Sequence, residues 1–470
     1  CGVSNHFSIY FKKISQGFAR VAHAKTVSAQ AVEPAAEPRR KLVGHRAHPV
    51  RRGDNRPLGR AEGLHDVRQR FGTLPRPPLR IGTSGDYAPF SLRTADGAVE
   101  GLDLDVARRF ARDTGRRIEL VPFHWSELTT ALAAGVFDIA MSGVTMRPER
   151  ALVGTFTRPI TTSGAVVLVR RGLAQTPEDV DRQGVRVAVN RGGHLERTAR
   201  RWFSQAHIET VDDNLTLPPQ LERGAVDAIV CDRFEAERWR AIIFPTPRLV
   251  GPFTVDHKAY LAREPGLAAE LDTWLRAHEA DGTMADLRRT WLGDADAAER
   301  SAFESDVDAL LALIDLRLAF MPSVAAAKLA AGLPVVDPEQ EEHVLAAARE
   351  DAHSYGLERR SVVALFSALI AAARTVQTDY AAVPAERRPF VEPADLHRTL
   401  RPAIGEVSRA ILRRASEVAR EPAALAALPV GGLARLLDPS LTVAANRDRI
   451  ATAIQGLRPA GDRSGASSDR

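Results

Sequence analysis

The sequence has 470 residues, of which 44% are hydrophobic and 6% aromatic, and this length suits two or three globular domains. The formal net charge of +5 comes largely from basic residues gathered between Arg39 and Arg60. Neither the aromatic nor the glycine pattern favours base stacking or phosphate tracking, so the composition argues against a nucleic-acid partner. The two cysteines, Cys1 and Cys231, lie too far apart in the chain to indicate a disulfide framework.

Residues 1–76 are rich in Pro, Arg, Ala and Gly, and we expect them to be largely disordered. The segment contains no apolar run long enough to span a membrane. Basic residues interrupt FSIYFKKISQGFARVAHA, the stretch that comes nearest to a signal-peptide core. The visible N-terminus therefore predicts neither a transmembrane segment nor a convincing export signal.

From Pro78 onward, short apolar strands alternate with amphipathic helices. The predicted strands are LRIGTS, RIELVPF and FDIAMSGVT, and the predicted helices between them are GLDLDVARRFARDTG and HWSELTTALAAG. This alternation predicts a parallel α/β sheet, in which ligands bind outside the carboxyl ends of the strands. The candidate site residues that follow those ends are Asp86, Tyr87, Trp125, Ser142, Thr145 and Arg150.

A second α/β unit follows, with GVRVAVN and AVDAIVCD as strands and RGGHLERTARRWF as the helix between them. The glycine pair at the start of that helix could cradle a phosphate, although a turn is the preferred interpretation without a fuller signature. From Ala259 the pattern returns to that of the first unit, and helices close the region at Gly293. The chain therefore predicts two lobes linked by two crossings.

Several segments of this region resemble the family-3 periplasmic solute-binding fold and, within it, the cyclohexadienyl dehydratases. The segments that carry the resemblance are TSGDYAPFS, GLDLDVARR, FDIAMSGVTMRPER, VNRGG and CDRFEA. The resemblance implies that Arg150 grips a ligand carboxylate, that Asp232 occupies the place of the acid that receives an amino group in amino-acid binders, and that Glu235 is the general acid of a dehydratase. Other pocket residues that it implies are Tyr87, Trp125 and Asn190. It also implies a periplasmic or secreted location.

Two positions depart from the dehydratase pattern. Ala165 stands where the dehydratases have a pocket lysine, and Leu195 stands where they have a pocket asparagine. His194 and Arg147 are candidates to compensate for these losses.

The alternative for Glu235 is a solvated residue on the helix that follows the strand. If Glu235 is instead buried between closed lobes, desolvation would raise its pKa and keep it protonated for donation to a leaving hydroxyl.

After Gly293 the chain is predicted to be nearly all helix. Within 314–345, Arg317 and Lys328 lie eleven residues apart, about three helical turns, so one long helix would project both cations from nearly the same face. Apolar residues surround them, although long cationic side chains can also reach solvent from such a position. No His, Cys or Asp cluster has metal-ligand spacing, and we expect no metal and no other cofactor.

This helical region resembles the secreted class of helical chorismate mutases, from roughly Asp306 to Ala415. The matching residues are Arg317, Lys328, Asp337, Glu341, Gln377 and Arg401. The resemblance implies that the two arginines grip the two substrate carboxylates, that the lysine and the glutamine bond the ether oxygen, and that an acidic residue receives the ring hydroxyl. Gln340 departs from the pattern, because the family usually has an arginine there. The resemblance also implies a possible homo-oligomer.

Together the two halves predict a two-lobed dehydratase domain at 77–294, a helical mutase domain at 300–455 and a tail at 456–470. The leading hypothesis is a bifunctional enzyme that converts chorismate through prephenate to phenylpyruvate, with the use of arogenate left open. The competing hypothesis joins an active mutase to a non-catalytic domain that binds an amino acid or prephenate. A transport receptor with a helical interaction domain is disfavoured by the ordered set of mutase residues.

Overall fold

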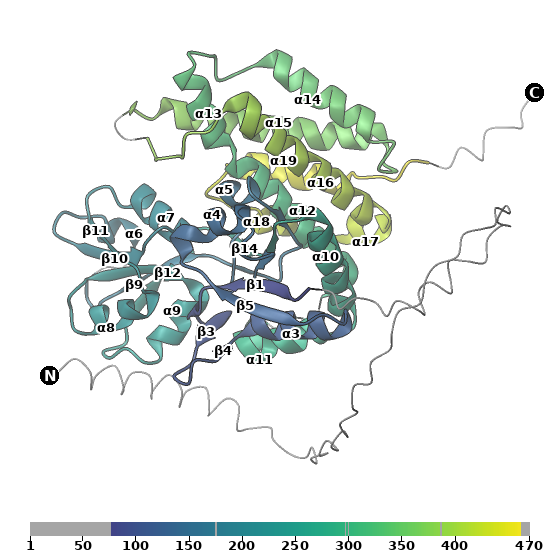
Figure 1. Ribbon diagram of the computed structural model, residues 1–470. Coiled ribbons are helices and arrows are strands. Elements are labelled where there is room, and N and C mark those ends of the chain that lie inside the picture. Colours follow the sequence, from purple (N-terminus) through teal and green to yellow (C-terminus); the bar gives the residue numbers. More distant parts are fainter. Residues whose placement is uncertain (1–76, 174–175, 297, 299, 386–387, 462–470) are drawn as a thin grey trace, which may run out of the picture. The chain divides into compact units, whose positions relative to one another are not determined.

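The computed structural model describes residues 77–461, apart from 174–175, 297, 299 and 386–387 (Figure 1). The segment 1–76, which is predicted to be disordered, and residues 462–470 of the predicted tail lie outside the described residues. We call residues 79–296 the α/β domain and residues 302–455 the helical domain.

The first lobe of the α/β domain is built on a five-stranded sheet with the order β5-β1-β6-β15-β7. Its strands are β1 (Leu79–Thr83), β5 (Ile118–Pro122), β6 (Ile139–Ala140), β7 (Thr155–Phe156) and β15 (Leu261–Ala262). The three strands predicted from the sequence pair in parallel, but β15 runs antiparallel to both β6 and β7. The predicted all-parallel sheet is therefore wrong in this detail, because β15 is formed by the chain that returns from the second lobe.

The remaining elements of the first lobe surround this sheet. The helices are α3 (Leu102–Asp113), α4 (Leu128–Ala133), α5 (Pro148–Ala151), α10 (Pro265–Ala280) and α11 (Thr283–Leu292), with short 3-10 turns at η1 (Trp125–Glu127) and η3 (Asp294–Asp296). A small sheet is formed by β2 (Asp86–Tyr87), β3 (Ser91–Arg93) and β4 (Val99–Glu100). The predicted turn GDYAPF thus contains the short strand β2, which brings Asp86 and Tyr87 to the end of β1.

The second lobe has a five-stranded sheet with the order β11-β10-β12-β9-β13. Its strands are β9 (Ala165–Val169), β10 (Arg186–Asn190), β11 (His207–Val211), β12 (Ala228–Asp232) and β13 (Arg248–Val250), and its helices are α6 (Pro177–Val180), α7 (His194–Trp202), η2 (Asn214–Thr216), α8 (Leu217–Glu222) and α9 (Arg233–Arg240). Strand β9, which the sequence analysis missed, is buried along its whole length. Gly192 has a φ of 77°, as the turn interpretation of the glycine pair expects.

Two antiparallel strands, β8 (Thr161–Ser163) and β14 (Asp256–Lys258), link the lobes. They are the two crossings that the sequence predicts, and Figure 1 shows β14 next to the first lobe's sheet. All three residues of β14 are buried. A short segment between the lobes therefore carries two charged side chains, Asp256 and Lys258, into the interior.

The helical domain consists of long helices with short connections. Its elements are α12 (Ala302–Ala319), α13 (Met321–Ala330), α14 (Pro338–Asp351), α15 (Arg359–Ala382), η5 (Leu396–Leu400), α16 (Arg401–Ala419), α17 (Pro422–Ala427), α18 (Val430–Leu436) and α19 (Ala444–Gln455). Their core includes Leu310, Leu365 and Ile411, which are fully buried. The predicted single helix through Arg317 and Lys328 is divided at Phe320 into α12 and α13, because Pro322, in the first turn of α13, has no backbone N–H to continue the hydrogen bonds of α12.

Two features of this domain bear on the remaining predictions. Within the described residues, the stretches Ala302–Ala330 and Arg359–Ala382 are long and apolar enough to cross a membrane by length and composition, but both belong to the domain's core.

The beginning of the predicted tail is packed rather than loose. Leu457 is fully buried, and the amide of Ala460 donates to the carbonyl of Gly356 at 2.9 Å. The apolar Leu457 side chain explains why the chain stays on the domain there.

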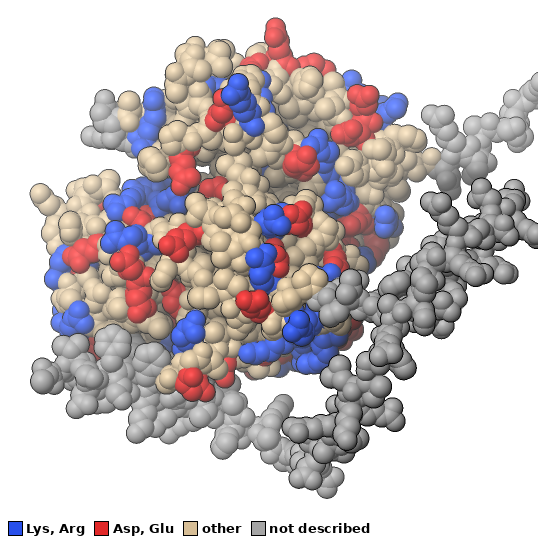
Figure 2. All heavy atoms as spheres, in the orientation of Figure 1, with Lys and Arg blue, Asp and Glu red and all other residues tan. Residues whose placement is uncertain are grey.

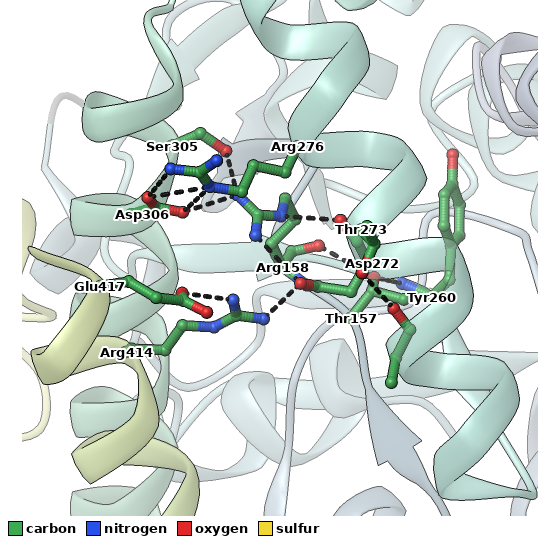
Figure 3. Close-up of polar contacts among 11 residues, drawn as sticks. Thr157, Arg158, Tyr260, Asp272, Thr273, Arg276, Ser305, Asp306, Arg414 and Glu417 are labelled. Atoms are coloured by element: carbon green, nitrogen blue, oxygen red, sulfur yellow. Dashed lines mark hydrogen bonds and ion pairs between the residues drawn. The ribbon is translucent and has the colours of Figure 1, made fainter. Parts of the chain in front are cut away.

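A buried network of charges joins the two domains. It comprises Arg158, Asp272 and Arg276 of the α/β domain and Ser305, Asp306, Arg414 and Glu417 of the helical domain (Figure 3). Arg158, whose side chain is 1% exposed, pairs with Asp272 at 2.9 Å and with Asp306 at 3.0 Å. Elsewhere on the face in Figure 2, basic and acidic side chains of the described residues are interspersed.

An Arg158→Met variant is expected to lose about 3 kcal/mol of unfolding free energy, because the substitution leaves buried carboxylates undercompensated. Arg276 pairs with the same Asp306 at 2.8 Å but is 42% exposed, so Arg276→Met is expected to cost less than about 1 kcal/mol. Denaturant unfolding of both variants measures the difference. Equal losses would contradict the role assigned to burial.

Candidate active sites

A cavity with an empty volume of about 410 Å³ lies in the α/β domain, and residues of both lobes line it. The predicted residues that line it are Tyr87, Trp125, Thr145, Arg150, Asn190 and Glu235, and the others are Gly143, Gly193, His194, Leu195, Asn214 and Lys258. Three predicted residues, Asp86, Ser142 and Asp232, do not line the cavity but are close to it in the structure. Asp86 accepts from the indole of Trp125 at 3.2 Å, Ser142 bonds Ser84 at 2.8 Å, and Asp232 is fully buried.

Glu235 lies in the first turn of α9, where the helix begins directly after β12. Asp232 is the N-cap residue, and its backbone amide donates to Glu235 at 3.4 Å in a capping box. The amide of Asn214 donates to the other oxygen of the Glu235 carboxyl. Only 2% of Glu235 is exposed, so the solvated alternative is wrong. Burial, followed by the negative charges of Asp232 and Asp86, raises the pKa of Glu235 well above its usual value.

Arg150 is the buried cation expected to hold a carboxylate. One of its guanidinium nitrogens donates to the carbonyl of Thr145 at 2.8 Å, and the guanidinium lies 5.5 Å from the ring of Trp125. Burial lowers the pKa of Arg150 to about 10, which leaves it charged at neutral pH. Among the described residues no carboxylate forms an ion pair with it. The guanidinium therefore has capacity to bind an anion in the cavity.

Two further polar atoms of the cavity wall are buried without a hydrogen-bond partner among the described residues. They are the hydroxyl oxygen of Tyr87 and the side-chain nitrogen of Asn190. Buried donors of this kind are costly when left unpaired. Together with Arg150 they make the cavity suited to a polar, negatively charged ligand.

Two polar residues that line the cavity, Lys258 and Asn214, were not among the predicted site residues. Lys258 on β14 lies 2.9 Å from Asp232 and 2.9 Å from the hydroxyl of Thr145. The amide of Asn214 contacts Glu235, as described above. The sequence analysis missed both residues, and the only local signal was the position of Lys258 in the segment that returns to the first lobe.

The two residues expected to compensate are engaged elsewhere. His194 lines the cavity, but its Nε2 lies 2.8 Å from Asp256. Arg147 pairs with the same carboxylate. Burial lowers the pKa of His194 to about 4, so the imidazole is neutral at neutral pH. Neither residue therefore compensates for the departures at Ala165 and Leu195, and the cations that line the cavity are Arg150 and Lys258.

A second, larger cavity lies within the helical domain, with an empty volume of about 1370 Å³. All six residues predicted for the mutase site line it: Arg317, Lys328, Asp337, Glu341, Gln377 and Arg401. Arg374 and Arg409 also line it and were missed. Arg374 precedes Gln377 by three positions on α15, so helical periodicity places both on one face. The break at Phe320 does not separate Arg317 from Lys328, because both helices face this cavity.

Arg317 is the most deeply buried cation of this site. It is 4% exposed, its Nε lies 3.4 Å from the hydroxyl of Ser408, and its Nη1 has no hydrogen-bond partner among the described residues. Desolvation lowers its pKa to about 10, so the guanidinium remains charged at neutral pH. A buried charge without a counter-ion is unfavourable unless an anion binds beside it. This observation points to an anionic ligand.

Lys328 and Gln377 present the neighbouring polar groups from α13 and α15. The ammonium of Lys328 donates to the carbonyl of Val335 at 2.7 Å, and burial lowers its pKa. The amide nitrogen of Gln377 donates to the carbonyl of Ala373 at 3.3 Å, and its oxygen has no partner among the described residues. The amide nitrogen of Gln377 also donates to the Sδ of Met321 at 3.4 Å, and sulfur is a weak acceptor. Lys328 has two further donors and can bond an additional oxygen directly, whereas Gln377 can do so by giving up its contact with the sulfur.

The two acidic residues predicted for this cavity, Asp337 and Glu341, are already paired. Asp337 caps α14 and lies 3.2 Å from Arg401, and Glu341 accepts from the Nε of Arg374 at 3.2 Å. Gln340, which replaces an expected arginine, also lines the cavity. Arg374 thus brings a guanidinium close to that part of the wall from another helix. The cavity combines five cationic side chains with apolar residues such as Met321, Val324 and Phe366.

Comparisons with known proteins divide the chain in the same way. The profile of the bacterial extracellular solute-binding proteins, family 3, matches residues 79–294, and that of chorismate mutase type II matches residues 307–378. Cyclohexadienyl dehydratase of Pseudomonas aeruginosa is 35% identical over 221 residues, which are 46% of this chain and 82% of the relative. The L-cystine-binding protein TcyJ of Escherichia coli is 27% identical over 242 residues, 49% of this chain and 87% of the relative.

Among solved structures, the ancestral amino acid-binding protein AncCDT-1, a precursor of cyclohexadienyl dehydratase, shares 31% identity with this chain. The alignment covers 48% of this chain and 98% of that protein, with a TM-score of 0.44. The family-3 profile thus spans the α/β domain, and the type II profile spans the first part of the helical domain, which includes Gln377 but not Arg401.

Proposed function

Since this chain belongs to the family-3 extracellular solute-binding proteins and carries a type II chorismate mutase domain, we propose that it converts chorismate to prephenate and prephenate to phenylpyruvate. The observation that carries the proposal is the buried Arg317, whose charge has no carboxylate partner among the described residues, in a cavity lined by all six mutase-like residues. The α/β cavity adds a buried carboxyl group, Glu235, whose pKa is raised by burial, as a proton donor in the second step requires.

The helical cavity suits a unimolecular rearrangement. In chorismate an ether carbon–oxygen bond breaks while a carbon–carbon bond forms, so the protein needs only to hold a reactive conformer and to stabilise negative charge on the ether oxygen. Arg317 and Arg401 would bind the two carboxylates. Lys328 would donate to the ether oxygen through one of its further donors, and Gln377 would donate to it in place of its contact with the Sδ of Met321.

The α/β cavity suits a decarboxylating dehydration. The bond between the ring and its carboxylate breaks, carbon dioxide leaves, and the electron pair completes the aromatic ring as the carbon–hydroxyl bond breaks. Glu235 would give its proton to the departing hydroxyl, which leaves as water, and would regain a proton from solvent. Arg150 would hold the side-chain carboxylate of prephenate while the lobes exclude water.

The first test supplies chorismate to the purified full-length protein at neutral pH and follows chorismate, prephenate and phenylpyruvate together. The expected result is transient prephenate followed by phenylpyruvate. Accumulation of prephenate alone would favour the alternative of an active mutase joined to a non-catalytic binding domain. Unchanged chorismate would overturn the mutase assignment.

A Gln377→Glu variant tests the proposed contact with the ether oxygen. Glutamine has no proton to lose, whereas a carboxylic acid at this position must stay protonated to donate a hydrogen bond. We expect the variant's mutase kcat to fall as pH rises above the carboxyl pKa, while the wild-type profile stays flat there. Matching pH profiles for the two proteins would contradict the contact.

Other properties follow from the same proposal. We propose that the protein acts in the periplasm or outside the cell, in keeping with the family's description as extracellular. Arogenate is a second candidate substrate, because it undergoes the same aromatisation as prephenate. Self-association of the helical domain is also proposed, and light scattering of the purified protein tests it.

A further inference from the structure

Asp232 and Glu235 form a pair of buried carboxylates at the start of α9, and the proposed dehydration needs the proton on only one of them. Both belong to the same helical turn, and each is at most 2% exposed. Two carboxylates this close in a desolvated site do not readily carry charge together, so one proton is shared or assigned. The carboxylate that holds this proton is decided by the contacts that differ between Asp232 and Glu235.

The contacts of the two carboxylates differ in charge. Asp232 accepts from the hydroxyl of Ser163 at 2.7 Å and from the amide of Phe234 at 2.9 Å, and Lys258 lies 2.9 Å from its other oxygen. Glu235 receives only neutral donors, the amide of Asn214 and the backbone amide of Asp232. The full positive charge therefore contacts Asp232 alone.

We propose that Lys258 is a positioning residue whose buried ion pair with Asp232 leaves the transferable proton on Glu235. This inference rests on the proposed dehydratase activity. Lys258 is suited to the task because it is 1% exposed, is fixed by the hydroxyl of Thr145 at 2.9 Å and lies 5.2 Å from the ring of Tyr87. The crossing strand β14 delivers this charge from the first lobe's side to a carboxylate of the second lobe.

The other groups that act on Glu235 do not make this distinction. Asp86 on β2 adds a negative charge that raises the pKa of Glu235, as Asp232 does, whereas the charge of Lys258 lowers it. His194 on α7 is neutral at neutral pH. Tyr87 and Cys231 also face the pair, and burial raises the pKa of both well above their usual values, so neither is charged. Lys258 is thus the cation that distinguishes the two carboxylates.

The test compares kcat-versus-pH profiles of prephenate dehydration for wild type, Lys258→Met and the double variant Asp232→Asn/Lys258→Met. In Lys258→Met the proton is shared with Asp232, so kcat is expected to fall about tenfold or more, within the range that a general acid contributes. The alkaline limb should move to higher pH, because a positive charge near the acid is gone. The double variant should recover part of the lost kcat, because no second carboxylate competes for the proton. Its alkaline limb should return to lower pH, toward that of wild type.

A Ser163→Ala variant is the matched control, since it removes a neutral contact of the same Asp232 and should shift the limb less. Mutase activity measured on each protein reports whether it is folded. The inference would be overturned if Lys258→Met lowered kcat without moving the alkaline limb, or if the double variant recovered no kcat. Lys258 would then contribute only to packing. If wild type itself releases no phenylpyruvate from prephenate, the proposed dehydratase function fails instead.

Discussion

A Glu235→Gln variant is expected to convert chorismate to prephenate at the wild-type rate and to release phenylpyruvate about 10² to 10⁴ times more slowly, the range attributed to general acid catalysis. Glutamine keeps the size of the side chain and can still accept from the amide of Asp232, so the capping box is preserved. What it lacks is an acidic proton. Following both products from supplied chorismate measures the two steps in one reaction.

The control for this variant is Glu237→Gln. Glu237 lies in the same helix, is 47% exposed on its side chain and pairs with Arg233 at 3.2 Å, away from the cavity. Neither activity should change in it. If Glu235→Gln still released phenylpyruvate at the wild-type rate, Glu235 would not be the proton donor and the dehydration would require another acid.

The raised pKa of Glu235 also sets the direction of the pH dependence. The reactive form is the protonated acid, so dehydratase kcat should be steady at low pH and fall as pH rises through that raised pKa. Mutase activity, which uses groups that stay charged or neutral throughout this range, should not follow the same curve. Coinciding profiles would point to a shared unfolding event rather than to titration of Glu235.

The second large effect is expected at Arg317. An Arg317→Met variant should lose about 10² to 10³ in mutase kcat/KM, the scale seen when one preorganised electrostatic contact is removed. Its dehydratase activity on supplied prephenate should remain. Stability should not fall, because the substitution replaces a buried charge that has no carboxylate partner among the described residues by an apolar side chain of similar length.

This combination of outcomes separates function from packing. A mutase loss with an unchanged or higher denaturation midpoint is the result expected of an anion-binding residue. Arg413→Met on the exposed side of α16 serves as control, and it should affect neither activity. If Arg317→Met retained full mutase activity, the assignment of the helical cavity would be wrong, whatever the measured stability.

Local sequence was sufficient for several parts of this protein. The alternation of strands and helices predicted the two-lobed α/β domain, and the two profile matches confirm that domain and the helical one. The alternation depends on periodicity within a segment, which the chain encodes locally. The six mutase-like residues and Glu235 were chosen from the resemblance of short ordered motifs to the two families, and all six mutase-like residues line one cavity.

Other features depended on the tertiary structure. The direction of β15 and the cation of Lys258 beside Asp232 arise from chain crossings between lobes. The amide of Asn214 contacts Glu235, 21 positions away, only through the packing of the second lobe. The pairing of Arg158 with Asp306 joins residues 148 positions apart. A side chain's own neighbours in sequence carry no information about such partners, because the contact is created only when distant segments pack. The sequence by itself therefore determined the two domains and most residues of their candidate sites, and only the packing of distant segments decided which charges are paired and which are left for a ligand.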